Sequence, residues 1–390
     1  MTIAISLLRR TPRYLILTFL AFVLAACDVA LPIGGAGPQL RSGTPVSVAM
    51  LLPYGSANAG DELVARSLEN AARLAASELN GVEVELTVYN TAGNAAQAAS
   101  VARQAVQDGA QVIIGPLRSD AAAAVGVAVA SSNIAVLSFS NNTEIAGGNV
   151  FVLGNTYENT AERLAGYAVT QGRNRVMILH AQNLAGEVAR DAVQSAVSRA
   201  GGTVAGVTSY EFSQTGVINA IPDVMGQIRS ADANALVITS DASAALPLFA
   251  QLLPENGLDT EAVRVMGLTR WDVPSQTLEL SGLQGGWFAL PDPNAAAAFN
   301  ARYTAAYGDA PHVLAGIGYD AMRAVGETAA TTGALGVTNL AGATGFNGAG
   351  GAFRLRSTGT VQRALAIAEI QDQQVAIIDP APGRLGGPGF

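Results

Sequence analysis

The chain has 390 residues, of which 49% are hydrophobic but only 6% aromatic, so its core is built largely from small side chains. This length suggests about two domains. The net charge of −8 argues against a nucleic-acid partner, and all 22 basic residues are arginines, which excludes a P-loop lysine and a lysine Schiff base. One cysteine and two histidines exclude an intramolecular disulfide and a Cys/His zinc site. We expect neither a metal nor a cofactor.

The first 26 residues have the pattern of a signal peptide. Three arginines precede an apolar run over residues 14–23, which is shorter than the roughly 20 residues of a spanning helix. The sequence Leu24-Ala25-Ala26-Cys27 resembles a bacterial lipobox, which implies cleavage before Cys27 and lipidation of that residue. An uncleaved anchor with an incidental cysteine is the alternative. We therefore expect a lipoprotein anchored at the periplasmic face of a membrane.

The residues after the cysteine bear on its location. Asp28 stands at the position where aspartate signals retention in the inner membrane of enterobacteria, so we expect the inner membrane. Glycines and prolines are frequent in residues 27–45, which predicts a flexible tether. Residues 381–390 are expected to form a C-terminal tail.

From residue 46 onwards, buried strands alternate with amphipathic helices. The first series predicts strands over 46–52, 83–89, 111–114 and 134–138, and helices over 61–80, 94–108 and from Ser119. The second predicts helices over 158–171, 186–200, 218–230 and 243–253, and strands over 175–180, 203–210, 235–239 and 263–267. Two such runs predict an α/β fold of two doubly wound, Rossmann-like lobes with mainly parallel sheets.

The last third departs from this rhythm. It predicts a strand over 285–290 and helices over 294–307 and 313–331. A glycine cluster at 345–351 then leads into three segments, 353–355, 363–370 and 375–378, which we expect to form an antiparallel meander.

Candidate ligand contacts lie in the loops after the strands, because open parallel sheets bind ligands beyond the carboxyl ends of their strands. These loops combine hydroxyls, amides, arginines and aromatic rings, which suits a small polar ligand. The candidates are Ser56, Arg118, Ser119, Phe139, Ser140 and Asn141 in the first series, and Asp241, Arg270 and Trp271 in the second.

At these loops the chain resembles the leucine/isoleucine/valine-binding proteins, which have the type I periplasmic-binding-protein fold. The resemblance is carried by Leu51-Leu52-Pro53 and by residues 109–119, 136–145 and 345–355. It implies two lobes, here residues 46–152 plus 292–342 and residues 153–291 plus 343–380. Three crossovers, near 151–155, 283–291 and 343–350, would form the hinge, and closure would trap the ligand.

The resemblance assigns roles to three first-lobe positions. Ser119 matches a hydroxyl contact to an amino-acid carboxylate, Phe139 matches a backbone contact, and Asn141 stands where a threonine commonly holds the ligand. In the second lobe the family often places an acidic residue for the ammonium group after the strand equivalent to 263–267. This chain has Arg270 there, which does not hold an ammonium, and Asp241 is the possible substitute.

Each candidate also has a purely structural interpretation. Ser119 and Asp241 suit helix N-caps, and Asn141 suits a turn. Arg118 suits a solvated loop position, while Arg270 and Trp271 suit a stacked surface pair.

These patterns favour a non-catalytic protein that binds a small polar or amino-acid-like ligand between its lobes, as the solute receptor of an ABC importer with its permease as partner. The alternative is a lipoprotein that activates a penicillin-binding protein, a peptidoglycan synthase, because residues 49–53 and 114–117 also resemble such activators. An enzyme has little support, since the sequence offers no nucleophile–base pair and no phosphate loop.

Overall fold

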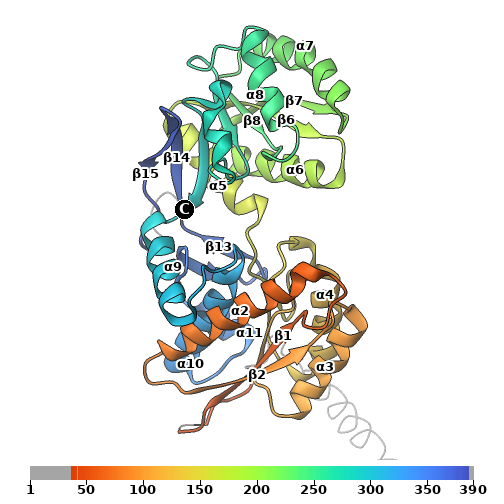
Figure 1. Cartoon of the computed structure of the whole chain (residues 1–390), viewed down its shortest axis with the longest axis vertical. Coiled ribbons are helices and arrows are strands. Elements are labelled where there is room, and N and C mark those ends of the chain that lie inside the picture. The colour runs from red at the N-terminus through yellow and green to blue at the C-terminus, as the bar shows by residue number, and fades with distance from the viewer. Residues whose placement is uncertain (1–36, 42, 386–390) are drawn as a thin grey trace, which may run out of the picture. The chain divides into compact units, whose positions relative to one another are not determined.

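The computed structural model describes residues 37–41 and 43–385 (Figure 1). The predicted signal peptide, Cys27, Asp28 and the last five residues of the predicted tail lie outside this part of the chain. Among the described residues, no helix combines the length and the apolar character needed to cross a membrane.

The first lobe is built on a parallel five-stranded sheet with strand order β2-β1-β3-β4-β5. Its strands are β1 (Val46–Leu52), β2 (Val84–Asn90), β3 (Val112–Ile114), β4 (Val136–Ser138) and β5 (Val150–Val152). The central strands are almost entirely apolar, with Ser47 the exception in β1, because helices cover both faces of the sheet. This confirms the parallel α/β character of the first series.

Two helix layers enclose this sheet (Figure 1). One layer contains α2 (Ala59–Ser77), α9 (Pro293–Tyr307), α10 (Ala315–Thr332) and α11 (Val337–Gly342). The other contains α3 (Ala95–Gln107) and α4 (Ser119–Val129). Alanines line most of the contact between α3 and the sheet, which explains how a chain poor in aromatic residues packs closely.

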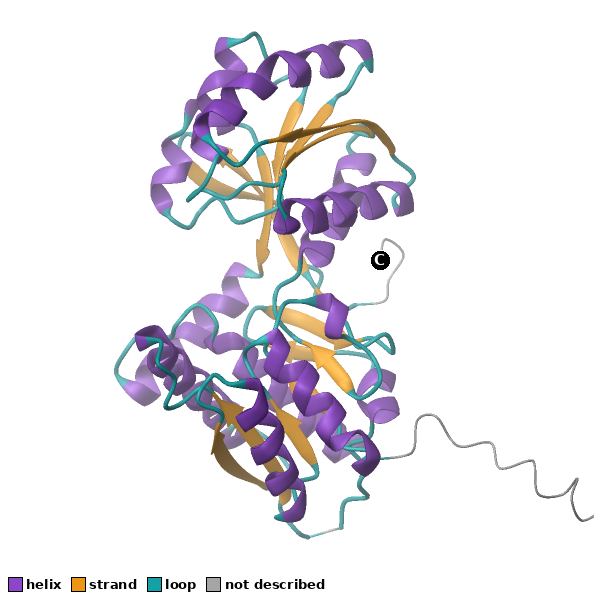
Figure 2. Cartoon of the chain, turned by 90° about the vertical axis from the view of Figure 1, so that its right-hand side faces the viewer, coloured by secondary structure: helices purple, strands orange, loops and turns teal. Residues whose placement is uncertain are grey.

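The second lobe is built on a seven-stranded sheet with strand order β15-β14-β10-β9-β8-β6-β7. The strands are β6 (Arg175–Ala181), β7 (Thr203–Tyr210), β8 (Ala235–Ile238), β9 (Arg264–Gly267), β10 (Trp287–Pro291), β14 (Leu365–Gln371) and β15 (Gln374–Asp379). Pairing is parallel from β7 to β10 and antiparallel from β10 to β15. Helices α5 (Tyr157–Thr170) and α6 (Leu184–Arg199) cover one face, and α7 (Gln214–Ser230) and α8 (Leu246–Glu255) cover the other (Figure 2).

The predicted meander is right only in part. Strands β14 and β15 pair antiparallel as expected, but the segment at 353–355 belongs to a different sheet. Strands β11 (Phe346–Gly348), β12 (Gly351–Leu355) and β13 (Val361–Arg363) form a small antiparallel sheet of their own. Phe353 and Val361 are buried in the core of the first lobe, whereas Ile367 of β14 is buried in the second. An apolar pattern predicts burial but does not reveal which core receives the side chains.

The chain passes between the two large sheets three times. The first passage follows β5 and the second follows β10, near two of the expected crossovers. The third falls at Ala364, between β13 and β14, and not at residues 343–350 as predicted. Residues 346–361 pack on the first lobe, so their expected assignment to the second lobe is corrected.

Part of the predicted tether packs on the first lobe. The Leu40 N–H donates to the Gly333 carbonyl at 2.9 Å, and Gln39 forms an isolated bridge with Ala334. Gly37 lies so close to Gly336 that an added Cβ would stand 2.4 Å from the Gly336 Cα. The chain is therefore docked on the end of α10 from Gly37 onwards, and only a glycine fits at this approach.

Candidate functional site

In the first lobe, Ser56 and Arg118 converge on Asp61 in the first turn of α2. Arg118 donates two hydrogen bonds to the Asp61 carboxylate, at 2.7 and 3.0 Å, and Ser56 donates a third at 2.7 Å. Burial raises the pKa of Asp61, but the bonds from Arg118 and Ser56 outweigh it, so the pKa lies below its ordinary value. Both predicted ligand contacts are thus engaged in tying α2 to the start of α4.

The start of α4 differs by one residue from the expected cap. Ser119 is the first residue of the helix, and Arg118 takes the N-cap position without a side-chain capping bond. Ser119 is half-buried, at the N-terminus of a helix that follows β3. Backbone N–H groups and the helix dipole favour an anion at such a position.

The loop after β4 forms the rest of the first-lobe group. Phe139 is buried in the core, and its N–H donates to the Pro116 carbonyl at 3.0 Å. The Ser140 hydroxyl is also buried and accepts a bond from the Asn142 N–H at 3.1 Å. Asn141 is exposed. Of these residues, Asn141 alone extends its side chain into solvent.

In the second lobe, Asp241 forms a turn with Ser243 and does not cap α8, which begins only at Leu246. Its negative charge acts on Tyr157 at the start of α5. Burial first, and the Asp241 charge second, raise the pKa of the Tyr157 hydroxyl. Asp241 and Tyr157 therefore share one electrostatic environment.

Arg270 and Trp271 are adjacent in sequence but separate in space. Trp271 is fully buried against Phe288, with ring centroids 5.8 Å apart, so it belongs to the core and its expected place in the site is corrected. Gly267 makes room for it, since a Cβ there would stand 2.2 Å from the indole. Arg270 is exposed and pairs with Asp272, whose hydrogen bond raises the pKa of the arginine.

A small cavity of about 180 Å³ lies where the chain passes between the sheets. Its walls come from the start of α5, the loop after β9 and the ends of β10 and β13. They include Tyr157, Asn159, Thr269, Arg270 and Arg363. Of the predicted site residues, Arg270 alone lines this cavity. The described residues form no hydrogen bond between the first-lobe group and the second-lobe group of candidates.

Two donors in the cavity wall are buried without a partner among the described residues. They are the Thr269 hydroxyl and the Nε of Arg363. A buried donor without a partner costs about 1–3 kcal/mol, so a ligand that supplied an acceptor to these two groups would remove that cost. Neither residue was singled out by the sequence.

Arg363 also ties the crossings together. Its guanidinium pairs with Asp320 of α10 at 2.6 Å and donates to the Leu153 carbonyl at 2.7 Å, while its backbone N–H donates to Asn159 of α5 at 3.2 Å. The Asp320 side chain is only 3% exposed and that of Arg363 only 10%. Through these bonds Arg363 joins α10 of the first lobe, the first crossing and α5 of the second lobe.

The candidates chosen from the sequence included neither Tyr157 nor Arg363, and they took Arg270 and Trp271 from the loop that also contains Thr269. Tyr157 and Thr269 do stand just after strands β5 and β9, so the rule that selected the other loops applies to them. Arg363 is the last residue of a strand, and no sequence signal marks the crossing that follows it.

Two α/β lobes, three chain crossings between them and a cavity at the crossings are the features of a binding protein that holds a small ligand between its lobes. The chain belongs to the family described as periplasmic binding protein, whose model matches residues 45–374. Members of this family bind solutes and are not enzymes. The fold class expected from the sequence is confirmed. Among curated proteins, none matches the sequence.

Solved structures share this fold at low sequence identity. A putative branched-chain amino acid ABC transporter protein from Rhodospirillum rubrum aligns with a TM-score of 0.72 and 20% identity, over 86% of this chain and all of that one. A solute-binding protein from Rhodopseudomonas palustris BisB5, in complex with 3,4-dihydroxybenzoic acid, aligns with a TM-score of 0.57 and 18% identity, over 88% and 99%. A Desulfitobacterium hafniense substrate-binding protein in complex with Leu aligns with a TM-score of 0.60 and 18% identity, over 86% of this chain and all of that one.

Proposed function

We propose that this protein is the solute receptor of an ABC importer and that it binds a small carboxylic acid in the cavity at the crossings. Membership of the periplasmic binding protein family supports this proposal. Proteins of the same fold were solved with leucine, with 3,4-dihydroxybenzoic acid and with benzoate. All three ligands carry a carboxylate, which is the group that the cavity wall best accommodates.

The observation that carries the proposal is the pair of unpartnered donors. A carboxylate accepts hydrogen bonds only, and its two oxygens have room for several donors. The Thr269 hydroxyl and the Arg363 Nε supply two such donors, and Arg270 adds a positive charge at the rim. Hydrogen bonds to a charged group contribute about 1.5–3 kcal/mol each, which suffices for a specific small-molecule site.

The lining of the cavity favours an acid without an ammonium group. As far as the structure describes it, the lining contains no carboxylate to receive an ammonium, and its two arginines are already paired, Arg270 with Asp272 and Arg363 with Asp320. Asp241 is outside this lining, although its charge reaches Tyr157. We therefore infer that aromatic or aliphatic monocarboxylates bind more tightly than zwitterionic amino acids.

The proposal includes a lipid anchor at Cys27. The lipobox-like sequence Leu24-Ala25-Ala26-Cys27 supports it. Metabolic labelling with a fatty-acid analogue tests the anchor. Label on the wild type and none on Cys27→Ser is expected, and equal label on both refutes the assignment.

A titration series tests the ligand class. Benzoate, 3,4-dihydroxybenzoate and leucine are compared with benzamide, which has the shape of benzoate without its charge. At a concentration 100 times its dissociation constant, a ligand stabilises the folded protein by about 2.7 kcal/mol, which a thermal shift detects. We expect a shift with at least one carboxylate and none with benzamide.

Two matched variants connect this shift to the cavity. Thr269→Val removes the unpartnered hydroxyl at almost constant volume, and Thr260→Val makes the same change elsewhere in the second lobe. We expect Thr269→Val to weaken carboxylate binding about tenfold and Thr260→Val to leave it unchanged. Equal binding in the two variants would contradict the proposed site, and failure of every carboxylate would contradict the ligand class.

A further inference from the structure

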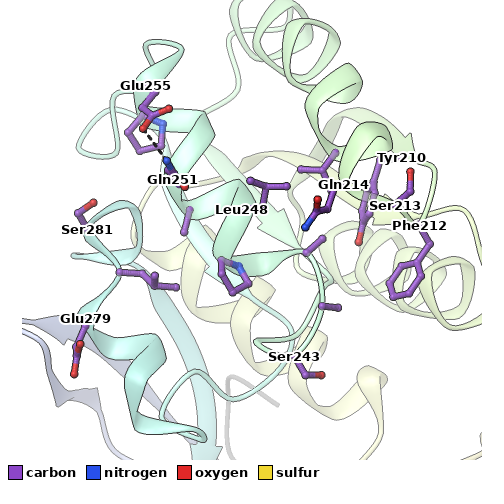
Figure 3. Close-up of a pocket in the computed structure, with 17 residues that line it drawn as sticks. Tyr210, Phe212, Ser213, Gln214, Ser243, Leu248, Gln251, Glu255, Glu279 and Ser281 are labelled. Atoms are coloured by element: carbon purple, nitrogen blue, oxygen red, sulfur yellow. Dashed lines mark hydrogen bonds between the residues drawn. The ribbon is translucent and has the colours of Figure 1, made fainter.

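The second lobe carries a groove that the proposed solute site does not use. It has a volume of about 900 Å³ and lies between the start of α7, the outer side of α8 and the 3-10 helices η3 (Ser275–Glu279) and η4 (Ser281–Leu283). Figure 3 shows Leu248 and Gln251 near its middle. The groove shares no lining residue with the cavity at the crossings.

The floor of the groove is apolar and already formed. Val217 and Ala250 are almost fully buried beneath it. Tyr210 packs edge-on against Phe249 with ring centroids 4.9 Å apart, and its hydroxyl is hydrogen-bonded to Ser240. Because these side chains are held by the core, a partner can bind without repacking the lobe.

The outer side of α8 provides the central contact surface. Leu248, Gln251 and Glu255 follow one another at spacings of three and four residues, so they lie on one side of the helix. The opposite side, with Phe249 and Leu253, faces the core. A half-buried leucine is thereby presented in the groove between polar side chains.

The lip of the groove exposes further apolar surface. Phe212, which lines the groove, is 61% exposed. Large aromatic side chains beside an apolar groove are typical of protein interfaces, where they act as anchors. A small solute enclosed in the groove would not need a phenylalanine exposed outside it.

The charges around the groove have one sign. Glu255 and Glu279 are its acidic lining residues, and among the described residues no arginine lines it. Glu255 is also the last residue of α8, where the helix dipole adds negative potential. The groove therefore complements a cationic segment.

We propose that this groove docks a partner protein through a segment that presents an apolar side chain next to a lysine or arginine. The apolar side chain packs on Leu248 and the floor, and the cation pairs with Glu255 or Glu279. The surface is separate from the solute cavity, so the inference stands whether or not a carboxylate binds there.

A pair of labelled peptides tests this proposal. The first is a short fluorescein-labelled helical peptide with two leucines four residues apart and a lysine on each side, and the second has glutamates in place of the lysines. Fluorescence anisotropy with the full mature chain should give at least about tenfold tighter binding for the lysine peptide. Equal binding of the two peptides would overturn the proposed charge complementarity.

Variants then place the peptide in the groove. Leu248→Gln, and the double change Glu255→Gln with Glu279→Gln, should each weaken the lysine peptide at least about fivefold. Glu261→Gln, an acidic position of the same lobe outside the groove, and Arg270→Ala in the solute cavity should bind like the wild type. Retained melting temperatures show that the variants are folded.

Three results contradict the proposal. Wild-type affinity in the double glutamate variant places the peptide elsewhere. Binding of phenethylamine as tight as that of the peptide makes the groove a small-molecule site. A dimer in sedimentation that Leu248→Gln dissociates makes a second copy of this chain the occupant.

Discussion

The two loops that contribute an arginine to the predicted site differ in what those arginines do. Arg118 in the first lobe is bound to Asp61, a residue 57 positions away, and so connects the starts of two helices. Arg270 in the second lobe pairs with Asp272, its neighbour in the same loop. Releasing Arg118 therefore breaks a contact of the fold, whereas releasing Arg270 disturbs only one loop. An arginine that pairs within its own loop can turn to a ligand without breaking a contact between elements of the fold.

The neighbours of these arginines narrow the contrast. Trp271 anchors the second-lobe loop in the core, so that Arg270 and Thr269 are held at the cavity while the indole is buried. The first-lobe loop also has an apolar residue packed on the core, Leu117, but there the neighbouring Arg118 is bound to Asp61 of another element. Both loops are therefore positioned by an apolar residue, and they differ in whether the arginine is held by a distant part of the fold.

The largest expected effect concerns this apolar anchor. Trp271→Ala should lower the free energy of unfolding by about 3–5 kcal/mol, because it empties a fully buried indole site. Arg270→Ala, one residue earlier, should change it by no more than about 0.5 kcal/mol. Urea denaturation of both variants measures the difference. A small loss in Trp271→Ala would mean that the indole does not anchor the loop.

The buried pair at the crossings should give an effect of similar size. Asp320→Ala leaves Arg363 charged and buried, which costs about 3–5 kcal/mol. Asp191→Ala, which breaks the exposed pair with the neighbouring Arg190 on α6, should cost no more than about 0.5 kcal/mol. Denaturation of the two variants compares them. Equal losses would show that the Asp320–Arg363 pair is no more important than a surface pair.

A smaller effect is expected at the first-lobe arginine. Asp61→Ala removes three side-chain hydrogen bonds, but Arg118 is 39% exposed and regains water. We expect a loss of about 1 kcal/mol in stability, accompanied by greater mobility of Arg118. Denaturation together with hydrogen exchange at the start of α4 tests this. Unchanged exchange there would contradict the positioning role of the pair.

The pH dependence of stability should be the smallest effect and should separate the lobes. Burial lowers the pKa of His180 in the second lobe, although its bond to the Ala181 carbonyl opposes this, so its contribution is present above the unfolded pKa of about 6.5 and is lost as the pH falls. The pKa of Asp61 is also lowered, so its contribution is present above the unfolded value of 3.8 and is lost as the pH falls through the folded pKa.

Melting temperatures of the wild type and of His180→Gln and Asp61→Asn across acidic pH compare these windows. Between pH 7 and 5, we expect the melting temperature of His180→Gln to fall less with decreasing pH than that of the wild type. For Asp61→Asn, we expect a smaller fall than in the wild type only below about pH 4. Parallel profiles for all three proteins would show that neither group is linked to folding.

Much of the fold was predictable because buried positions recur in the sequence with the period of the helix or strand that they belong to. The strand predicted over residues 46–52 and the helix predicted from Ser119 begin where the structure places them. The meander was not predictable in the same way, because Phe353 and Ile367 are equally apolar although they enter different cores. The packing of the segment at Gly37 was not predicted, because the glycine there permits a close backbone approach, and composition alone does not distinguish this role from flexibility.

The candidate site was less predictable than the fold. Strand ends selected the candidate loops, but the sequence does not show which side of a loop each residue faces, and Arg270 and Trp271 therefore appeared equivalent. Arg118 pairs with Asp61, which is 57 residues away in the sequence, so the sequence pattern did not predict this pair. Arg363 reaches the cavity only because the third crossing falls immediately after it.

Calorimetric titration of the two arginine variants tests the central claim most directly. With a carboxylate that binds the wild type, Arg270→Ala should weaken binding at least about tenfold, whereas Arg118→Ala should weaken it less than about threefold. Arg229→Ala, an exposed arginine at the end of α7, serves as the control. An unchanged affinity in Arg270→Ala, or a larger loss in Arg118→Ala, would contradict a solute site built on the second-lobe loop.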